Sequence, residues 1–260
     1  MIATRRVAPP AIFFAVVLIG WEAAIRAGGG ARNAPYPGGI ALAAVQAFGD
    51  GTLVLAPAGS LQRVLLGFAI GGAIGIPLGL AMGLVMPVDR ALRPVVDSLR
   101  SIAPIAWIPM AVLWLGIRGD AALFIVAYAA VFPFVLNTIQ AVRLIDRKLV
   151  HAARALGASR ALVLRSVVIP GAVPMILVGA RIAMAFAWGS IIAAELAIGI
   201  KVTSGGAATV GLGQLMVETL YVRRDVNALV LYMIVIGIVS LAIDLGTRRL
   251  QELLLPWTRR

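Results

Sequence analysis

The chain has 260 residues, of which 61% are hydrophobic and 13% are charged, and its mean hydropathy is +1.00. Soluble domains are roughly half apolar and a quarter charged, so this composition excludes an ordinary soluble globule and predicts an all-α integral membrane protein. The absence of cysteine and the single histidine, His151, exclude disulfides, thiol catalysis and a histidine-based metal site. The net charge is +12, and the arginines lie between the apolar runs. This distribution indicates loops that face the cytoplasm and anionic lipid, and it argues against a nucleic-acid-binding protein.

The first apolar run, residues 7–21, follows Arg5 and Arg6. A cleavable signal peptide is one interpretation of this pattern. Trp21 and Glu22, however, stand where such a peptide needs small residues before the cleavage site. We therefore expect this run to be a retained first helix.

Five further apolar segments are about long enough to cross a hydrocarbon core of roughly 30 Å. They are residues 64–86, 101–117, 121–142, 171–198 and 226–243. In the second of these five, Pro104 and Pro109 predict a kinked helix. The sequence thus predicts six spans, divided into an N-terminal helix with an external loop, residues 1–59, and a five-helix core, residues 60–260.

The positive charges indicate the orientation of these spans. With the N-terminus inside, fifteen Lys and Arg residues fall in cytoplasmic regions and seven in external regions. Cytoplasmic loops carry the excess of positive charge, so both termini are expected in the cytoplasm. Residues 27–59, rich in Gly, Pro and Ala, are expected to form an external loop with a short interfacial helix near residues 39–48.

A glycine stripe runs along the second span, with one glycine at every fourth position. Its members are Gly67, Gly71, Gly75, Gly79 and Gly83. Without side chains there, a neighbouring helix can approach closely enough to pack against the backbone. Because a step of four residues overshoots a helical turn by about 40°, we expect the stripe to wind and to serve more than one helix or a crossing partner. A pore lining is the second interpretation.

Between the fourth and fifth spans lies a basic stretch, residues 143–170, which we call the elbow. Gly157 is suited to end one helix, Ser159 to cap the next, and Pro170 to begin the fifth span. Small Ala152 and Ala153 leave a shallow face, and the surrounding arginines predict contact with an acidic partner or anionic lipid. The alternative is a loop whose charge only sets the topology.

The elbow resembles the coupling loop of binding-protein-dependent ABC importer permeases, in which Glu-Ala-Ala is followed by three residues, Gly, nine residues and Ile-x-Leu-Pro. Ala152, Ala153, Gly157 and Pro170 match this pattern, whereas His151 replaces the glutamate. The stretch from about Ser60 to Trp257 is similar to the nitrate, taurine and aliphatic sulfonate branch. The residues that carry this similarity are Arg63, Gly67-Phe68, Pro104, Pro109, Trp114-x-Gly116-Ile117, Phe132-Pro133, Gly179 to Ala183, Trp188, Ala194-Glu195 and Gly211-Leu212-Gly213.

The resemblance implies a six-helix type I importer permease in a bacterial inner membrane, working as a homodimer. Its implied partners are an ATP-binding subunit inside and a solute-binding protein outside, and its implied solute is a small anion. The ATP-binding subunit would contact the coupling loop, for which His151, Ala152, Ala153, Arg154, Gly157, Ala158, Ser159 and Pro170 are the candidate residues. The chain has no phosphate-binding Gly-x-x-x-x-Gly-Lys-Ser/Thr sequence, so ATP and magnesium are expected on that partner and no cofactor on this chain.

Two ionisable residues, Arg181 and Glu195, lie within the predicted fifth span. Charges in spans are costly and often mark transport routes, so both are candidates for a translocation pathway, with pairing to a neighbouring helix as the structural alternative. An ion-coupled secondary transporter is the competing class for the whole chain. Such carriers show inverted repeats and buried acidic or histidine relays, and the sequence has neither an evident repeat nor many acidic residues in its spans.

Overall fold

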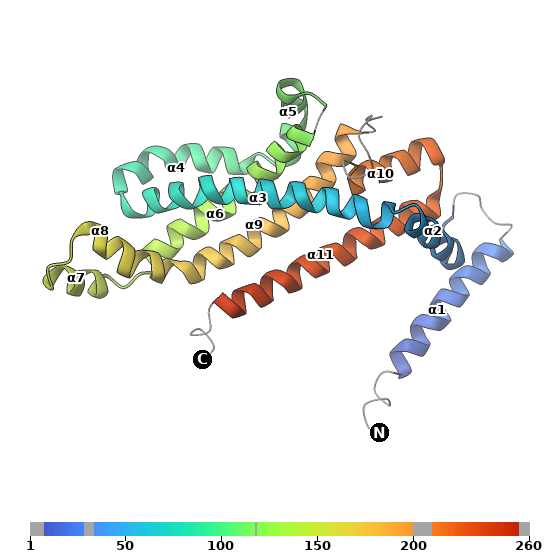
Figure 1. Ribbon diagram of the computed structural model, residues 1–260, viewed down its shortest axis with the longest axis horizontal. Helices are drawn as coiled ribbons and strands as arrows, with labels where there is room; N and C mark the ends of the chain where they lie inside the picture. Colours follow the sequence, from blue (N-terminus) through green and yellow to red (C-terminus); the bar gives the residue numbers. More distant parts are fainter. Residues whose placement is uncertain (1–7, 29–33, 118, 200–209, 255–260) are drawn as a thin grey trace.

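The computed structural model describes residues 8–28, 34–117, 119–199 and 210–254, and every element assigned within them is a helix (Figure 1). Some residues used in the sequence predictions lie outside these ranges, namely seven of the counted positive charges and the last residue of the stretch that resembles the permease family. These residues are Arg5, Arg6, Arg32, Arg118, Lys201, Arg259, Arg260 and Trp257.

Four helical stretches are long and apolar enough to cross a membrane. They are α3 (Thr52–Leu84), α6 (Gly119–Arg143), the continuous run Arg160–Ile198 that contains α9 (Ile169–Ile198), and α11 (Val226–Leu254). A bent pair of helices supplies a fifth crossing when counted as one span. At its N-terminal end the chain adds α1 (Ala8–Ala27), whose 20 residues span about 30 Å.

The bent pair corrects the prediction of one kinked helix over residues 101–117. Helix α4 (Met86–Ser101) ends before Ile102, whose backbone is extended, and the chain resumes in η1 (Pro104–Trp107) and α5 (Ile108–Leu115). The two halves meet at 88°. The prolines break the helix rather than bend it, because Pro104 begins a new helical segment and Pro109 lies in the first turn of the next. The eight residues of α5 rise only about 12 Å, too little to cross a membrane alone.

Between α1 and α3 lies α2 (Pro37–Gly49), a helix over the residues at which the sequence predicts a short interfacial helix. Helix α3 begins at Thr52, so the connecting region ends earlier than the predicted boundary at residue 59. Asp50 closes the turn, because its carboxylate accepts hydrogen bonds from the Thr52 amide at 3.0 Å and hydroxyl at 2.6 Å. These two bonds lower the pKa of the Asp50 carboxyl. The Gly and Pro content of this stretch had favoured a loop, whereas Pro57 is accommodated inside α3.

The glycine stripe packs α3 against α6 along its whole length. A Cβ at Gly67 would lie 2.5 Å from Val126 Cγ1, and one at Gly79 would lie 2.6 Å from Thr138 Cβ. The remaining contacts pair Gly71 with Ala130, Gly75 with Phe134 and Gly83 with Val142. Of the two predicted alternatives, more than one helix or a crossing partner, these contacts favour a single partner helix, α6. The partner residues on α6 also recur every four positions, so both ridges wind together and stay in contact.

The outer parts of the bundle are attached more sparsely. Leu231 of α11 packs against Ala43 and Ala47 of α2, and the Gly38 amide donates to Glu22 of α1 at 3.1 Å. Figure 1 shows α1 diverging from the other helices. Helices α2 and α10 (Leu212–Glu218) lie away from the end of the molecule that is formed by α7 (Arg147–Ala155) and α8 (Arg160–Val163). The two ends of the long axis are thus built from different segments of the chain.

Candidate functional site

The elbow has the helix–turn–helix structure that its sequence predicts. Helix α7 (Arg147–Ala155) begins after Asp146, whose carboxylate accepts from the Lys148 amide at 2.8 Å. Gly157 then adopts a left-handed backbone with φ of +81°, which a residue with a side chain rarely adopts. The helix end is closed by the Ala158 amide, which donates to the Ala153 carbonyl at 3.0 Å.

The second helix of the elbow, α8 (Arg160–Val163), begins at the predicted cap. The Ser159 hydroxyl accepts from the Leu162 amide at 3.3 Å. A π-helical turn, η2 (Leu164–Val168), continues into α9, where Pro170 occupies the first turn as predicted. Val163 and Val168 are buried and attach the elbow to the bundle. The local geometry of Gly157, Ser159 and Pro170 is thereby confirmed.

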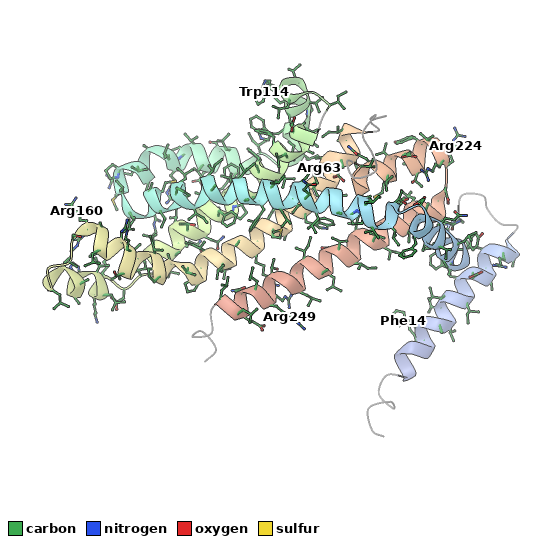
Figure 2. All side chains as sticks on the ribbon, viewed as in Figure 1. Phe14, Arg63, Trp114, Arg160, Arg224 and Arg249 are labelled. Atoms are coloured by element: carbon green, nitrogen blue, oxygen red, sulfur yellow. The ribbon has the colours of Figure 1, made fainter. Side chains whose placement is uncertain are left out.

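The outer face of the elbow is open to solvent. His151, Ala152 and Arg154 are exposed, and Ala153 is half-buried. Figure 2 shows Arg160 at one end of the molecule and Arg224, which precedes α11, at the other. The elbow is therefore a terminal feature of the long axis, accessible to a partner that approaches this end.

Glu195, which is fully buried, forms the centre of a polar cluster at the opposite end of α9. Its carboxylate pairs with the Arg63 guanidinium and accepts from the Ser60 hydroxyl at 2.9 Å and the Gly213 amide at 3.0 Å. The Ser60 oxygen also accepts from the Leu212 amide at 3.0 Å. These bonds join α3, α9 and the start of α10 and balance the buried charge.

The glycines on either side of Leu212 are explained by the same cluster. A Cβ at Gly211 would overlap the Glu195 carboxylate, and one at Gly213 would lie 2.7 Å from Glu195 Cβ. The backbone can approach the carboxylate only because both positions lack a side chain. Arg63, Glu195 and Gly211-Leu212-Gly213, which the sequence offers as separate marks, thus form one structural unit.

Arg181, the other ionisable residue singled out in this span, lies on α9 opposite Asp244 of α11. Its guanidinium donates two hydrogen bonds to the same Asp244 oxygen, at 2.7 and 3.1 Å. Arg248 approaches the second carboxylate oxygen at 2.9 Å. This pairing is the structural alternative offered by the sequence, although the sequence did not identify Asp244 as the partner, and it connects the C-terminal half of α11 to α9. The four-residue spacing of Asp244 and Arg248 indicates only their own pair within α11.

A third ionic contact precedes the elbow. Asp89, at the start of α4, forms two ion pairs. Its carboxylate lies 2.7 Å from the guanidinium of Arg143, at the end of α6, and 2.5 Å from that of Arg93 in its own helix. The sequence analysis counted Arg93 and Arg143 only as topology signals. Their shared carboxylate ties α4 to the helix that leads into the elbow.

Two apolar hollows lie beside α9. One, of about 520 Å³, is lined mainly by Phe68, Ile76, Phe134 and Leu177. The other, of about 350 Å³, is formed by Pro104 and Ile105 against Phe186, Gly189 and Ser190 of α9. Neither Arg181 nor Glu195 lines these two hollows. The two ionisable residues contact neighbouring helices instead.

Long apolar helices held together by backbone contacts, with their internal charges paired and a basic bend exposed at one end, define a multi-pass membrane transport subunit. The sequence profile of the family described as binding-protein-dependent transport system inner membrane component matches residues 75–260. The chain belongs to this family. It is the permease subunit of an ABC importer, a transport component rather than an enzyme.

Similar proteins include relatives from Escherichia coli (strain K12). The taurine transport system permease protein TauC is 36% identical over 219 residues, covering 84% of this chain and 76% of TauC. The putative aliphatic sulfonates transport permease protein SsuC is 36% identical over 254 residues, covering 97% of this chain and 92% of SsuC. The solved structure of the MetNI methionine ABC transporter has a similar fold, with a TM-score of 0.62 at 20% identity over 75% of this chain and 92% of that chain.

Proposed function

We propose that this permease moves a small anionic solute, of the taurine, alkanesulfonate or nitrate type, into the cytoplasm. The observation that supports the solute class is the similarity to relatives named for taurine and aliphatic sulfonates, together with bicarbonate transport permeases. In this proposal two copies of the chain form the passage. A solute-binding protein delivers the anion outside, and ATP with magnesium is bound by a separate subunit inside.

The proposed orientation places both termini and the elbow in the cytoplasm of a bacterial cell. The positive charges of the predicted inner regions support it. The elbow would then contact the ATP-binding subunit through His151, Ala152, Ala153, Arg154, Gly157, Ala158 and Ser159, with Pro170 at its junction with α9. Closure of two ATP-binding subunits would move both elbows as rigid bodies.

The packing of the bundle suggests how such a motion would spread. The elbow connects α6 to α9, and α6 packs on the glycine stripe of α3. Gly179 of α9 lies so close to Asn137 of α6 that a Cβ at this position would not fit. Closely packed helices transmit displacement with little compression. We therefore propose that α3, α6 and α9 tilt together, while the short helices η1 and α5 move relative to them at the 88° bend.

For Arg181 and Glu195 we propose a structural role. Each is paired across helices, Arg181 with Asp244 and Glu195 with Arg63. An anion that used either as a ligand would have to displace a carboxylate or approach one closely, which like-charge repulsion opposes. In this proposal solute selectivity rests with the solute-binding protein.

An uptake assay tests the proposed function. The permease is reconstituted in proteoliposomes with its ATP-binding subunit and solute-binding protein, and radiolabelled taurine, ethanesulfonate, nitrate and bicarbonate are compared with a neutral amino acid. Accumulation of one anion that requires ATP on the elbow side is the expected result. Uptake that persists with an ion gradient and without the ATP-binding subunit would indicate a secondary transporter instead.

A further inference from the structure

The elbow carries an unusual charge distribution. From Arg147 to Arg165 the sequence contains five Lys and Arg residues and no Asp or Glu. The acidic residue immediately before this stretch, Asp146, uses its carboxylate to cap α7 through the Lys148 amide. At position 151, where the family pattern has a glutamate, this chain has a histidine, His151. The elbow thus presents cationic and neutral groups to its surroundings.

These cations lie where a partner could reach them. Arg147, His151 and Arg154 are spaced four and three residues apart, so they share one face of α7. All three are exposed, as are Arg160 and Arg165 on the return side of the elbow. Opposite charge for this face must therefore come from another molecule if it is to be neutralised.

The neighbouring cations on α4 and α6 behave differently. Arg93 and Arg143 share Asp89, and Arg100 contacts Asp97 at 2.9 Å. By contrast, none of the five cations between Arg147 and Arg165 forms an ion pair with another described residue. The fold neutralises these three basic residues of α4 and of the C-terminal end of α6, whereas those from Arg147 to Arg165 form no ion pair with a described residue.

An apolar side chain projects from the middle of this basic surface. Leu156, directly before the left-handed Gly157, is 89% exposed. Figure 1 shows α7 and α8 at one end of the long axis, where the turn between them extends beyond the neighbouring ends of α3 and α4. A leucine held there by a rigid turn is suited to fill a pocket on a protein, because buried apolar anchors within a polar rim dominate interface energies.

We propose that the groove which receives this elbow has an apolar floor for Leu156 and a wall of Asp and Glu side chains facing Arg147, His151 and Arg154. The inference rests on the proposed function, since it takes the ATP-binding subunit as the occupant, and it specifies the chemistry of that subunit's groove. Charge complementarity favours a carboxylate wall and disfavours a basic one. A glutamate at position 151 would face this wall with like charge.

Binding measurements with charge variants test the inference. The full-length permease is placed in nanodiscs of phosphatidylcholine alone, and binding of the importer's own purified ATP-binding subunit is measured at 50 and 300 mM NaCl. His151→Glu and Arg154→Glu are each expected to weaken binding, raising the dissociation constant by roughly tenfold at low salt and by less at high salt. Arg90→Glu, an exposed charge reversal on α4 outside the elbow, is the matched control and is expected to leave binding unchanged.

A second arm reverses the charge on the partner. Replacing the groove carboxylate nearest Arg154 by lysine should weaken binding to the unmodified permease and restore binding to Arg154→Glu, as expected for a direct charge pair. Leu156→Asp should abolish binding at both salt concentrations, because it removes the apolar anchor.

The outcomes separate the possible failures. If the unmodified permease does not bind the ATP-binding subunit, the proposed function itself is wrong. If it binds, and Leu156→Asp abolishes binding while His151→Glu and Arg154→Glu do not weaken it, the acidic wall is wrong and the docking role stands. If the charge variants affect binding only in nanodiscs that contain phosphatidylglycerol, the cations serve the lipid surface, and the inference is overturned.

Discussion

Glu195 illustrates how this chain keeps a charged group inside its helical bundle. An isolated carboxylate in a buried position is costly, and the cost is offset here by Arg63, the Ser60 hydroxyl and the Gly213 amide. The partners come from α3 and α10 and Glu195 from α9, so the cluster also fixes the relative positions of these three helices. Its importance for stability therefore depends on all partners being present.

Glu195→Gln is expected to lower the free energy of unfolding by about 3–5 kcal/mol, because it leaves the mostly buried Arg63 guanidinium without its carboxylate. The midpoint of chemical unfolding in detergent measures this loss. Arg100→Gln, which disrupts an exposed pair with Asp97, is the control and should cost about 0–1 kcal/mol. Equal losses in the two variants would contradict the structural role of Glu195.

Arg181 allows structural pairing to be separated from solute contact. Because the Arg181–Asp244 pair is partly exposed, Arg181→Gln and Asp244→Asn are each expected to reduce stability far less than Glu195→Gln does. Neither should change the KM for uptake, since the pair joins two helices. A raised KM in Arg181→Gln that is absent in Asp244→Asn would instead assign Arg181 to the anion pathway.

At the scale of single helices, the α3–α6 contact is the closest in the bundle. Gly75→Ala is expected to destabilise the protein by about 1–3 kcal/mol, because the added Cβ would lie 2.7 Å from Phe134 Cβ and from the Val131 carbonyl. Thermal unfolding in detergent measures the effect. Gly237→Ala on α11 is the matched control, since no atom lies within 4 Å of its Cβ position. A gain in stability at both positions, which is what helix propensity alone predicts, would contradict the packing account.

The turn of the elbow depends on the backbone of Gly157. Gly157→Pro cannot adopt a φ of +81° and removes the amide that donates to the Arg154 carbonyl, so it should prevent complex formation with the ATP-binding subunit. Gly157→Asn should retain the complex, because asparagine tolerates the left-handed region. Co-purification measures both. Unchanged assembly of Gly157→Pro would count against the elbow as the docking element.

The sequence predicts the helices of this protein better than their contacts. The long apolar runs identify α3, α6, α9 and α11, and Gly157 and Ser159 identify the turn of the elbow, because these signals are local. The 88° bend before Pro104 was predicted only as a kink, since proline allows either outcome.

The ion pairs were beyond sequence reasoning for a different reason. Arg63 and Glu195 are 132 positions apart, and Arg181 and Asp244 are 63 apart, so no spacing rule connects them. Only the packing of the helices brings them together. The glycine stripe predicts which face of α3 is packed against another helix, but it does not predict which helix. The matching positions on α6 carry side chains of ordinary size, so their four-residue spacing is not apparent in the sequence.

At the scale of the whole molecule, the two ends of the bundle differ in construction. One end has the exposed basic elbow, and the other has α2, while the buried Glu195 cluster joins α3, α9 and α10 between them (Figure 1). An importer permease needs two different ends, because one end must contact the solute-binding protein and the other the ATP-binding subunit. The proposal assigns the elbow end to the cytoplasm.

Cysteine labelling tests this assignment most directly, because the natural chain contains no cysteine. Leu156→Cys, at an exposed position of the elbow, and Gln46→Cys, at an exposed position of α2, form a matched pair. A membrane-impermeant maleimide is applied to right-side-out and to inverted membrane vesicles. Leu156→Cys is expected to react only in inverted vesicles and to be protected by the bound ATP-binding subunit, and Gln46→Cys only in right-side-out vesicles. Labelling of Leu156→Cys from the external side would contradict the account.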